Sequence, residues 1–231
     1  MSDELLKIVG FGQHKILILD DFLDNPEEVI AAACDLSPFE KAPQSTYYPG
    51  IRRYITSNML GARPYVDTMR EALLPIMAHF YGAKSIEVDE PSFSMVTNAP
   101  NELSQIQTVP HFDDLDENFF AILHYLSPSH KSGTSLYRHN ETGIEKVTLL
   151  NRDTYINSLS KQLSQKPREQ KYMLGSDELF TEIYNIEGVF NRVAIYQGAI
   201  LHSGNITPDE NLSHDPKKGR LTANIFVRIS K

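Results

Sequence analysis

Hydrophobic and polar positions in residues 1–90 predict one strand and two helices. The apolar run 15–22 predicts a strand that leads into a turn. Residues 25–35 begin with asparagine, proline and two glutamates, which is typical of a helix start. Residues 63–82 predict a second helix, because apolar side chains recur at helical spacing between an Arg-Pro start and a terminal glycine. The tyrosine-rich stretch 41–57 predicts a long ordered loop with some extended structure.

From residue 86 onwards the pattern changes to short β-type runs that turn residues separate. The predicted strands are 91–97, 119–126, 133–139, 190–196 and 221–229. Such a series predicts an antiparallel sandwich or barrel. The polar block 151–186 interrupts it, and its apolar residues at helical spacing predict a helical insertion.

Composition limits the class of protein. A chain of 231 residues with 41% hydrophobic and 23% charged residues predicts a folded protein, and the length suits one domain. The net charge of −8 argues against a nucleic-acid binder and against binding to an anionic membrane surface. A single cysteine allows no intramolecular disulfide, and the acidic start lacks a signal-peptide pattern, so we expect a cytoplasmic protein.

One histidine and one aspartate carry the first chemical signal. His111 and Asp113 are two positions apart, so in an extended strand their side chains lie on the same face. A second histidine would complete the two-histidine, one-carboxylate triad that is diagnostic of non-haem Fe(II) oxygenases. His202 follows the apolar stretch 193–201 and has small neighbours. Taken singly, each residue also fits an ordinary surface turn or a core histidine.

The last predicted strand carries a second signal. Arg220, Thr222 and Asn224 share one face of an extended strand. A guanidinium inside a barrel is costly unless an anion meets it, and a bidentate carboxylate is the natural partner. The alternative is a surface arginine at a strand end that pairs with an acid of the preceding loop.

In this order the motifs resemble the Fe(II)- and 2-oxoglutarate-dependent oxygenases, nearest to the prolyl-4-hydroxylase type and among uncharacterised bacterial members. The resemblance covers residues 91–229. It implies a mainly β (α+β) fold, a double-stranded β-helix of the jelly-roll or cupin-like kind. It further implies a single domain over 1–231, in which 1–90 support a core that spans 91–231.

The resemblance also implies roles for individual residues. The metal and catalytic set would be His111, Asp113 and His202, with Fe(II) as the metal. The cosubstrate 2-oxoglutarate would pair through its distal carboxylate with Arg220, assisted by Thr222 and by the hydroxyl of Tyr125.

Two features depart from the family pattern. Ser132 replaces the first glycine of the Gly-Gly strand that Gly133 continues. Arg220 follows His202 by 18 positions, more than is usual, and Arg228 is the alternative anchor. Substrate contacts are expected from the far end of the 133–139 strand and from the last strand, at Arg138, His139 and Asn224.

Three hypotheses about function follow. The first is a Fe(II)- and 2-oxoglutarate-dependent dioxygenase, a hydroxylase of an unknown small molecule or peptide. The second is a cupin-like metal enzyme that does not use 2-oxoglutarate. The third is a non-catalytic β-sandwich binding protein with a fortuitous His-x-Asp. We expect no nucleic-acid or membrane partner, and the insertion at 151–186 could cover the site or form a homodimer contact.

Overall fold

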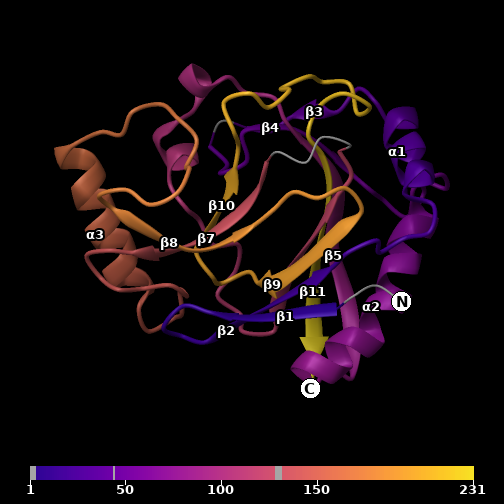
Figure 1. Cartoon of the computed structure of the whole chain (residues 1–231), viewed down its shortest axis with the longest axis horizontal. Helices are drawn as coiled ribbons and strands as arrows, with labels where there is room; N and C mark the ends of the chain where they lie inside the picture. Colours follow the sequence, from indigo (N-terminus) through magenta and orange to yellow (C-terminus); the bar gives the residue numbers. More distant parts are fainter. Residues whose placement is uncertain (1–3, 44, 128–131) are drawn as a thin grey trace.

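Two antiparallel sheets form the centre of the computed structural model, which describes residues 4–43, 45–127 and 132–231 (Figure 1). The larger sheet runs in the order β1 (Glu4–Val9), β2 (His14–Leu19), β9 (Arg192–Gln197), β6 (Phe119–Tyr125), β11 (Leu221–Ser230), β5 (Ser85–Val96), β4 (Gly50–Tyr54) and β3 (Glu40–Lys41). The smaller sheet runs in the order β10 (His202–Asn205), β7 (Gly133–His139) and β8 (Phe180–Ile186). The predicted mainly β class is confirmed.

The helices α1 (Pro26–Asp35) and α2 (Arg63–Tyr81) pack against the outer face of the larger sheet (Figure 1). Helix α2 buries Met69, Leu73 and Met77 against Phe93 of β5. Burial of each such side chain contributes roughly 2 kcal/mol. The helix ends at Gly82, whose φ of 73° is the left-handed conformation that glycine adopts without a steric penalty. Both predicted N-terminal helices are confirmed.

The space between the two sheets holds a second core. In β2, Leu17 and Leu19 face the helices, whereas Ile16 and Ile18 join the core between the sheets. This alternation has the two-residue period of a strand. Both faces of β2 are therefore buried, which explains why the sequence shows a continuous apolar run there.

The helix α3 (Arg152–Gln165) covers the outside of the smaller sheet, where Tyr155 and Leu159 pack with Tyr137 and Phe180. The helical prediction for 151–186 is therefore right for its first part and wrong for its end. Residues 180–186 form β8, an edge strand paired with β7. The apolar spacing in this segment also fits a helix, and the pairing with β7 overrides the local pattern.

Short elements at the edges of the sheets differ from the sequence prediction as well. Strands β1, β3 and β10 were not predicted. Strand β4 lies inside 41–57, which was predicted as a loop with some extended structure. Two short 3-10 helices, Pro100–Glu102 and Gln105–Thr108, precede the first metal-ligand candidate. Within the part of the chain that the structure describes, no helix is long and apolar enough to span a membrane.

Candidate metal centre

The two candidate histidines are held opposite each other by backbone hydrogen bonds. His111 and His202 form an isolated antiparallel bridge, in which each amide donates to the other carbonyl at 2.8 Å. A pair bonded in this way directs both side chains to the same face. The ring centroids lie 4.3 Å apart. Asp113 follows two positions after His111, with its amide hydrogen-bonded to the carbonyl of Gly198 at 2.8 Å.

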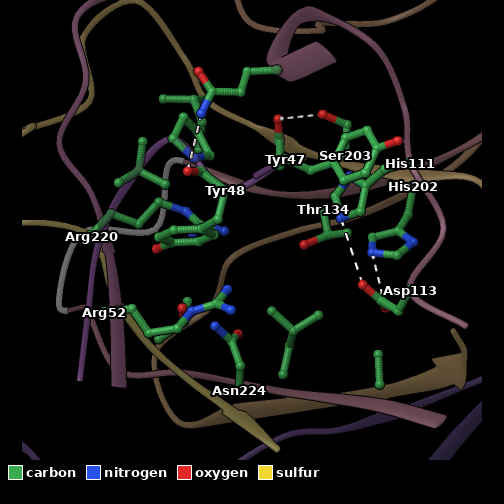
Figure 2. A pocket seen from close by; sticks show the side chains of 18 of the residues that line it. Tyr47, Tyr48, Arg52, His111, Asp113, Thr134, His202, Ser203, Arg220 and Asn224 are labelled. Carbon is green, nitrogen blue, oxygen red and sulfur yellow. Dashed lines mark hydrogen bonds and ion pairs between the residues drawn. The ribbon is translucent and has the colours of Figure 1, made fainter. Parts of the chain in front are cut away.

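The side chains of His111, Asp113 and His202 converge in the structure. Nε2 of His111 lies 3.7 Å from Oδ1 of Asp113, and Nε2 of His202 lies 3.4 Å from Oδ2 of Asp113 (Figure 2). The three ligand atoms all lie within 4.8 Å of one another. Neighbouring ligands of one metal ion, each at about 2.1 Å, are about 3 Å apart. The atoms therefore surround a common point, and the donor set of two imidazoles and one carboxylate fits a ferrous ion.

The hydrogen bond of His202 identifies its ligand atom. Nδ1 of His202 donates to the carbonyl oxygen of Ile200 at 2.8 Å. A carbonyl can only accept, so Nδ1 carries the proton and the neutral ring presents a lone pair at Nε2. A backbone carbonyl in this position is a common way to orient a metal-binding imidazole.

Burial shifts the pKa values of His111 and Asp113 in opposite directions. Burial lowers the pKa of His111 well below its usual value, and the charges of His202 and Arg52 act in the same direction. Burial raises the pKa of the Asp113 carboxyl, and His202 and Arg52 offset part of this effect. A divalent cation would stabilise the neutral imidazoles and the ionised carboxylate together, because metal ligands bind in their deprotonated forms.

Aromatic rings and a glycine fix the positions of the ligands. Tyr47 stacks on His111 with the ring centroids 5.0 Å apart, and Tyr196 lies edge-on to His202 at 5.1 Å. A Cβ at Gly198 would lie 2.7 Å from the ring of Phe119 and 3.2 Å from Cβ of Asp113. Glycine at this position therefore allows the close approach that places the carboxylate.

A cavity of about 100 Å³, the inner cavity, opens beside the triad. The inner cavity is bounded on one side by β11, whose residues Thr222 and Asn224 line it together with Arg220, which directly precedes the strand. Figure 2 shows Arg220 and Asn224 at this wall. Tyr125, opposite Thr222 on the neighbouring strand β6, does not line the inner cavity; its hydroxyl donates to Oγ1 of Thr134, which does, at 2.8 Å. Arg220 and Thr222 thus line the same space as the triad, and the hydroxyl of Tyr125 contacts this lining through Thr134.

Arg220 is 5% exposed and is fixed at the far side of the inner cavity. Its Nε and Nη2 donate to the backbone carbonyls of Ser132 and Gly133 at 3.1 and 2.9 Å. A guanidinium has five N–H donors, so donors remain for a bound carboxylate. Arg228, the alternative anchor, instead pairs with Asp114 at 2.6 Å and with Asp116 at 2.9 Å.

Two of the predicted substrate residues lie elsewhere. Arg138 pairs with Glu145 at 3.3 Å, and its guanidinium lies over the ring of Phe11. His139 is fully buried, and its ring nitrogens are hydrogen-bonded to Thr142 at 2.9 Å and to Gln162 of α3 at 2.8 Å. His139 thus lies under α3 and Arg138 lies against Phe11, and neither residue lines the inner cavity.

Arg52, which lies on β4 and also lines the inner cavity, was not predicted as a site residue. Its Nε donates to Oγ of Ser94 at 3.0 Å, and its Cζ lies 4.4 Å from the ring centroid of Tyr48. Arg52 belongs to a stretch predicted as a loop, more than 50 positions before His111, and no local motif connects the two.

Comparison with solved structures shows the fold. SnoN, a non-haem α-ketoglutarate-dependent epimerase from nogalamycin biosynthesis, matches with a TM-score of 0.55 and 10% identity over 95% of this chain and 79% of that chain. A prolyl hydroxylase from Trichoplax adhaerens matches with a TM-score of 0.52 and 11% identity over 93% and 83%. HygX from Streptomyces hygroscopicus with iron bound matches with a TM-score of 0.52 and 9% identity over 95% and 84%.

These neighbours share the double-stranded β-helix of iron- and 2-oxoglutarate-dependent oxygenases, so the resemblance drawn from the sequence is confirmed at the level of the fold. No curated protein matches the sequence. The model of DUF6445, a family of unknown function, matches residues 5–227, and the chain belongs to this family.

Proposed function

We propose that this protein is a non-haem Fe(II)- and 2-oxoglutarate-dependent oxygenase, a hydroxylase of a small molecule or peptide. The observation that carries the proposal is the convergence of His111, Asp113 and His202 on one point beside a cavity that contains a buried arginine. The fold of the neighbouring structures supports it.

His111, Asp113 and His202 would hold the ferrous ion. Two histidines and one carboxylate leave other coordination positions of the metal open. When bound, ferrous iron with 2-oxoglutarate and dioxygen supplies the oxidising power that hydroxylation of a C–H bond requires. The protein contributes binding, orientation and shielding of this chemistry.

Arg220 would bind the distal carboxylate of 2-oxoglutarate with the donors that the carbonyls of Ser132 and Gly133 leave free. Thr222 lines the same cavity at the next inward position of β11. Tyr125 and Thr134 form a buried hydroxyl pair nearby. Because Arg220 is buried, its interaction with a carboxylate is poorly screened by water and strong.

Tyr47 would limit access of water to the metal, because its ring covers His111 on the side of a second cavity. This outer cavity has a volume of about 420 Å³ and shares Tyr47, Arg52 and the two ligands His111 and Asp113 with the inner one. The cosubstrate would occupy the part of the inner cavity next to Arg220, and the substrate would reach the triad through the outer cavity.

The test has two readouts that need no known substrate. Anaerobic Fe(II) protein should develop a visible absorption band when 2-oxoglutarate is added, and with dioxygen it should slowly convert 2-oxoglutarate to succinate. Asp113→Ala should lose both, whereas His214→Ala, an exposed histidine, should keep both. Metal binding without an effect of 2-oxoglutarate would favour the cupin-like alternative and contradict the proposal.

A further inference from the structure

Arg52 lies where the inner and outer cavities meet. It is among the lining residues of both, as are His111 and Asp113, whereas Arg220 and Asn224 line only the inner one. Arg52 is therefore placed near the triad, on the route by which a substrate would reach it.

The guanidinium of Arg52 is held in place but lacks an ionic partner. Ser94 accepts a hydrogen bond from its Nε, and the ring of Tyr48 lies beneath it. Among the described residues, no carboxylate lies within 4.0 Å of its nitrogens, whereas the next residue, Arg53, pairs with Glu40 at 3.4 Å. A half-buried charge that is fixed and unpaired is expected where an anion binds.

Asn224 provides a second, independent indication. Its side chain is directed into the inner cavity, the residue is only 7% exposed, and Oδ1 has no hydrogen-bond partner among the described residues. Figure 2 shows the polar ends of Arg52 and Asn224 directed into the same cavity. A carboxylate cannot satisfy this oxygen, because both groups only accept hydrogen bonds. No described residue accepts a hydrogen bond from Nδ2 of the same amide, so its two hydrogens are available to donate to a carboxylate in the cavity.

We infer that Arg52 and Asn224 form a second anion-binding subsite, separate from Arg220, that binds a carboxylate group of the primary substrate. The inference rests on the proposed function, in which Arg220 takes the distal carboxylate of 2-oxoglutarate. One dicarboxylate cosubstrate then leaves the second guanidinium for another anion.

The neighbourhood favours a carboxylate over a phosphate. The planar fork of a guanidinium matches a carboxylate bidentately, and an asparagine amide can donate to the same group. The outer cavity also contains the carboxylates of Asp89, Glu90 and Asp114. Their negative charge would repel a dianionic phosphate more strongly than a single carboxylate.

Binding of a carboxylate and of its matched amide tests the subsite. Zn(II)-loaded protein, which cannot turn over, is saturated with 2-oxoglutarate and titrated with benzoate or benzamide by ligand-observed NMR. Wild type should bind benzoate at least ~10-fold more tightly than benzamide, because a hydrogen bond to a charged carboxylate is stronger than one to a neutral amide. Arg52→Gln should remove this preference, Asn224→Ala should reduce it, and the neighbouring control Arg53→Gln should retain it.

Affinity for 2-oxoglutarate, measured on the same proteins by calorimetry, distinguishes the two arginines. We expect Arg52→Gln to stay within ~3-fold of wild type and Arg220→Gln to lose ~10-fold or more. Loss of 2-oxoglutarate binding in Arg52→Gln but not in Arg220→Gln would make Arg52 the cosubstrate anchor and overturn the inference. Equal binding of benzoate in wild type and Arg52→Gln, or equal binding of benzoate and benzamide, would also overturn it.

Failure of the proposed function is recognised separately. If 2-oxoglutarate does not bind to wild type, the proposed function fails. The benzoate titration can then be done without 2-oxoglutarate and still tests Arg52. Arg52→Gln and Arg53→Gln remove the same charge from the same strand, so weaker benzoate binding in Arg52→Gln alone is specific to Arg52. Thermal unfolding of each variant confirms that a lost interaction does not reflect an unfolded protein.

Discussion

A buried histidine on the helix side of β6 should make the stability of the protein depend on pH. His124 is fully buried, with Nδ1 3.1 Å from the hydroxyl of Tyr65 and Nε2 3.1 Å from Oδ1 of Asn191. The amide oxygen of Asn191 accepts, so Nε2 carries the proton and Nδ1 accepts from Tyr65. Burial lowers the pKa of His124 to about 4, and the hydrogen bond to Asn191 offsets only part of the effect.

The sign and the size of the effect follow from this pKa. Between about pH 6.5 and pH 4 the unfolded chain binds a proton at this histidine and the folded chain does not, so stability falls as the pH falls. A pKa difference of about 2.5 at about 1.4 kcal/mol per unit corresponds to about 3 kcal/mol across this window. The contribution is complete above pH 6.5 and is lost at about pH 4.

Urea unfolding at pH 7 and at pH 4 measures this difference. The free energy of unfolding of wild type should fall more than that of His124→Gln, and the excess should be about 3 kcal/mol. Leu73→Ala, which destabilises the core without removing a titrating group, should show the wild-type pH dependence. Equal pH dependence in wild type and His124→Gln would refute the reasoning.

The other predictions concern packing, strand pairing and the metal site. Met69→Ala should lower the free energy of unfolding by about 2–5 kcal/mol, measured by urea denaturation, because Met69 is fully buried between α2 and the larger sheet. Gly133→Ala should lower the melting temperature, since its Cβ would lie 1.8 Å from the carbonyl oxygen of Ile186 across the β7–β8 pair; an unchanged melting temperature would contradict this. Gly198→Ala should weaken metal affinity in a calorimetric titration, since its Cβ would press on Asp113, and unaltered affinity would argue against this contact.

Several helices and strands could be predicted from the sequence because their start, end and spacing patterns are local. The helix starting at Pro26, the helix that ends at Gly82 and the strand 133–139 each carry their own capping or alternation pattern. The two-residue spacing of His111 and Asp113 was visible in the sequence, but residues 111–113 form no strand. An isolated bridge to His202 and the bond of Asp113 to Gly198 hold them in place. His202 was inferred from its position after an apolar strand.

The features that the sequence did not predict depend on tertiary contacts. Strand β8 exists because it pairs with β7, and β10 is a four-residue strand whose polar sequence lacks alternation. Arg138 and His139 were predicted to contact the substrate, but they line neither cavity, because Arg138 pairs with Glu145 and His139 bonds to Gln162 of α3. The sequence does not show either contact. Arg52 reaches the site only because β4 pairs with β5 beside β11.

Titration with Co(II), a spectroscopic substitute for Fe(II), tests the central claim that three side chains bind one metal. Wild type should bind one ion per chain, with a visible spectrum that changes when 2-oxoglutarate is added. His111→Ala, Asp113→Ala and His202→Ala should each lose the site, while His214→Ala should keep it. A spectrum and a stoichiometry that survive in all three ligand variants would contradict the account.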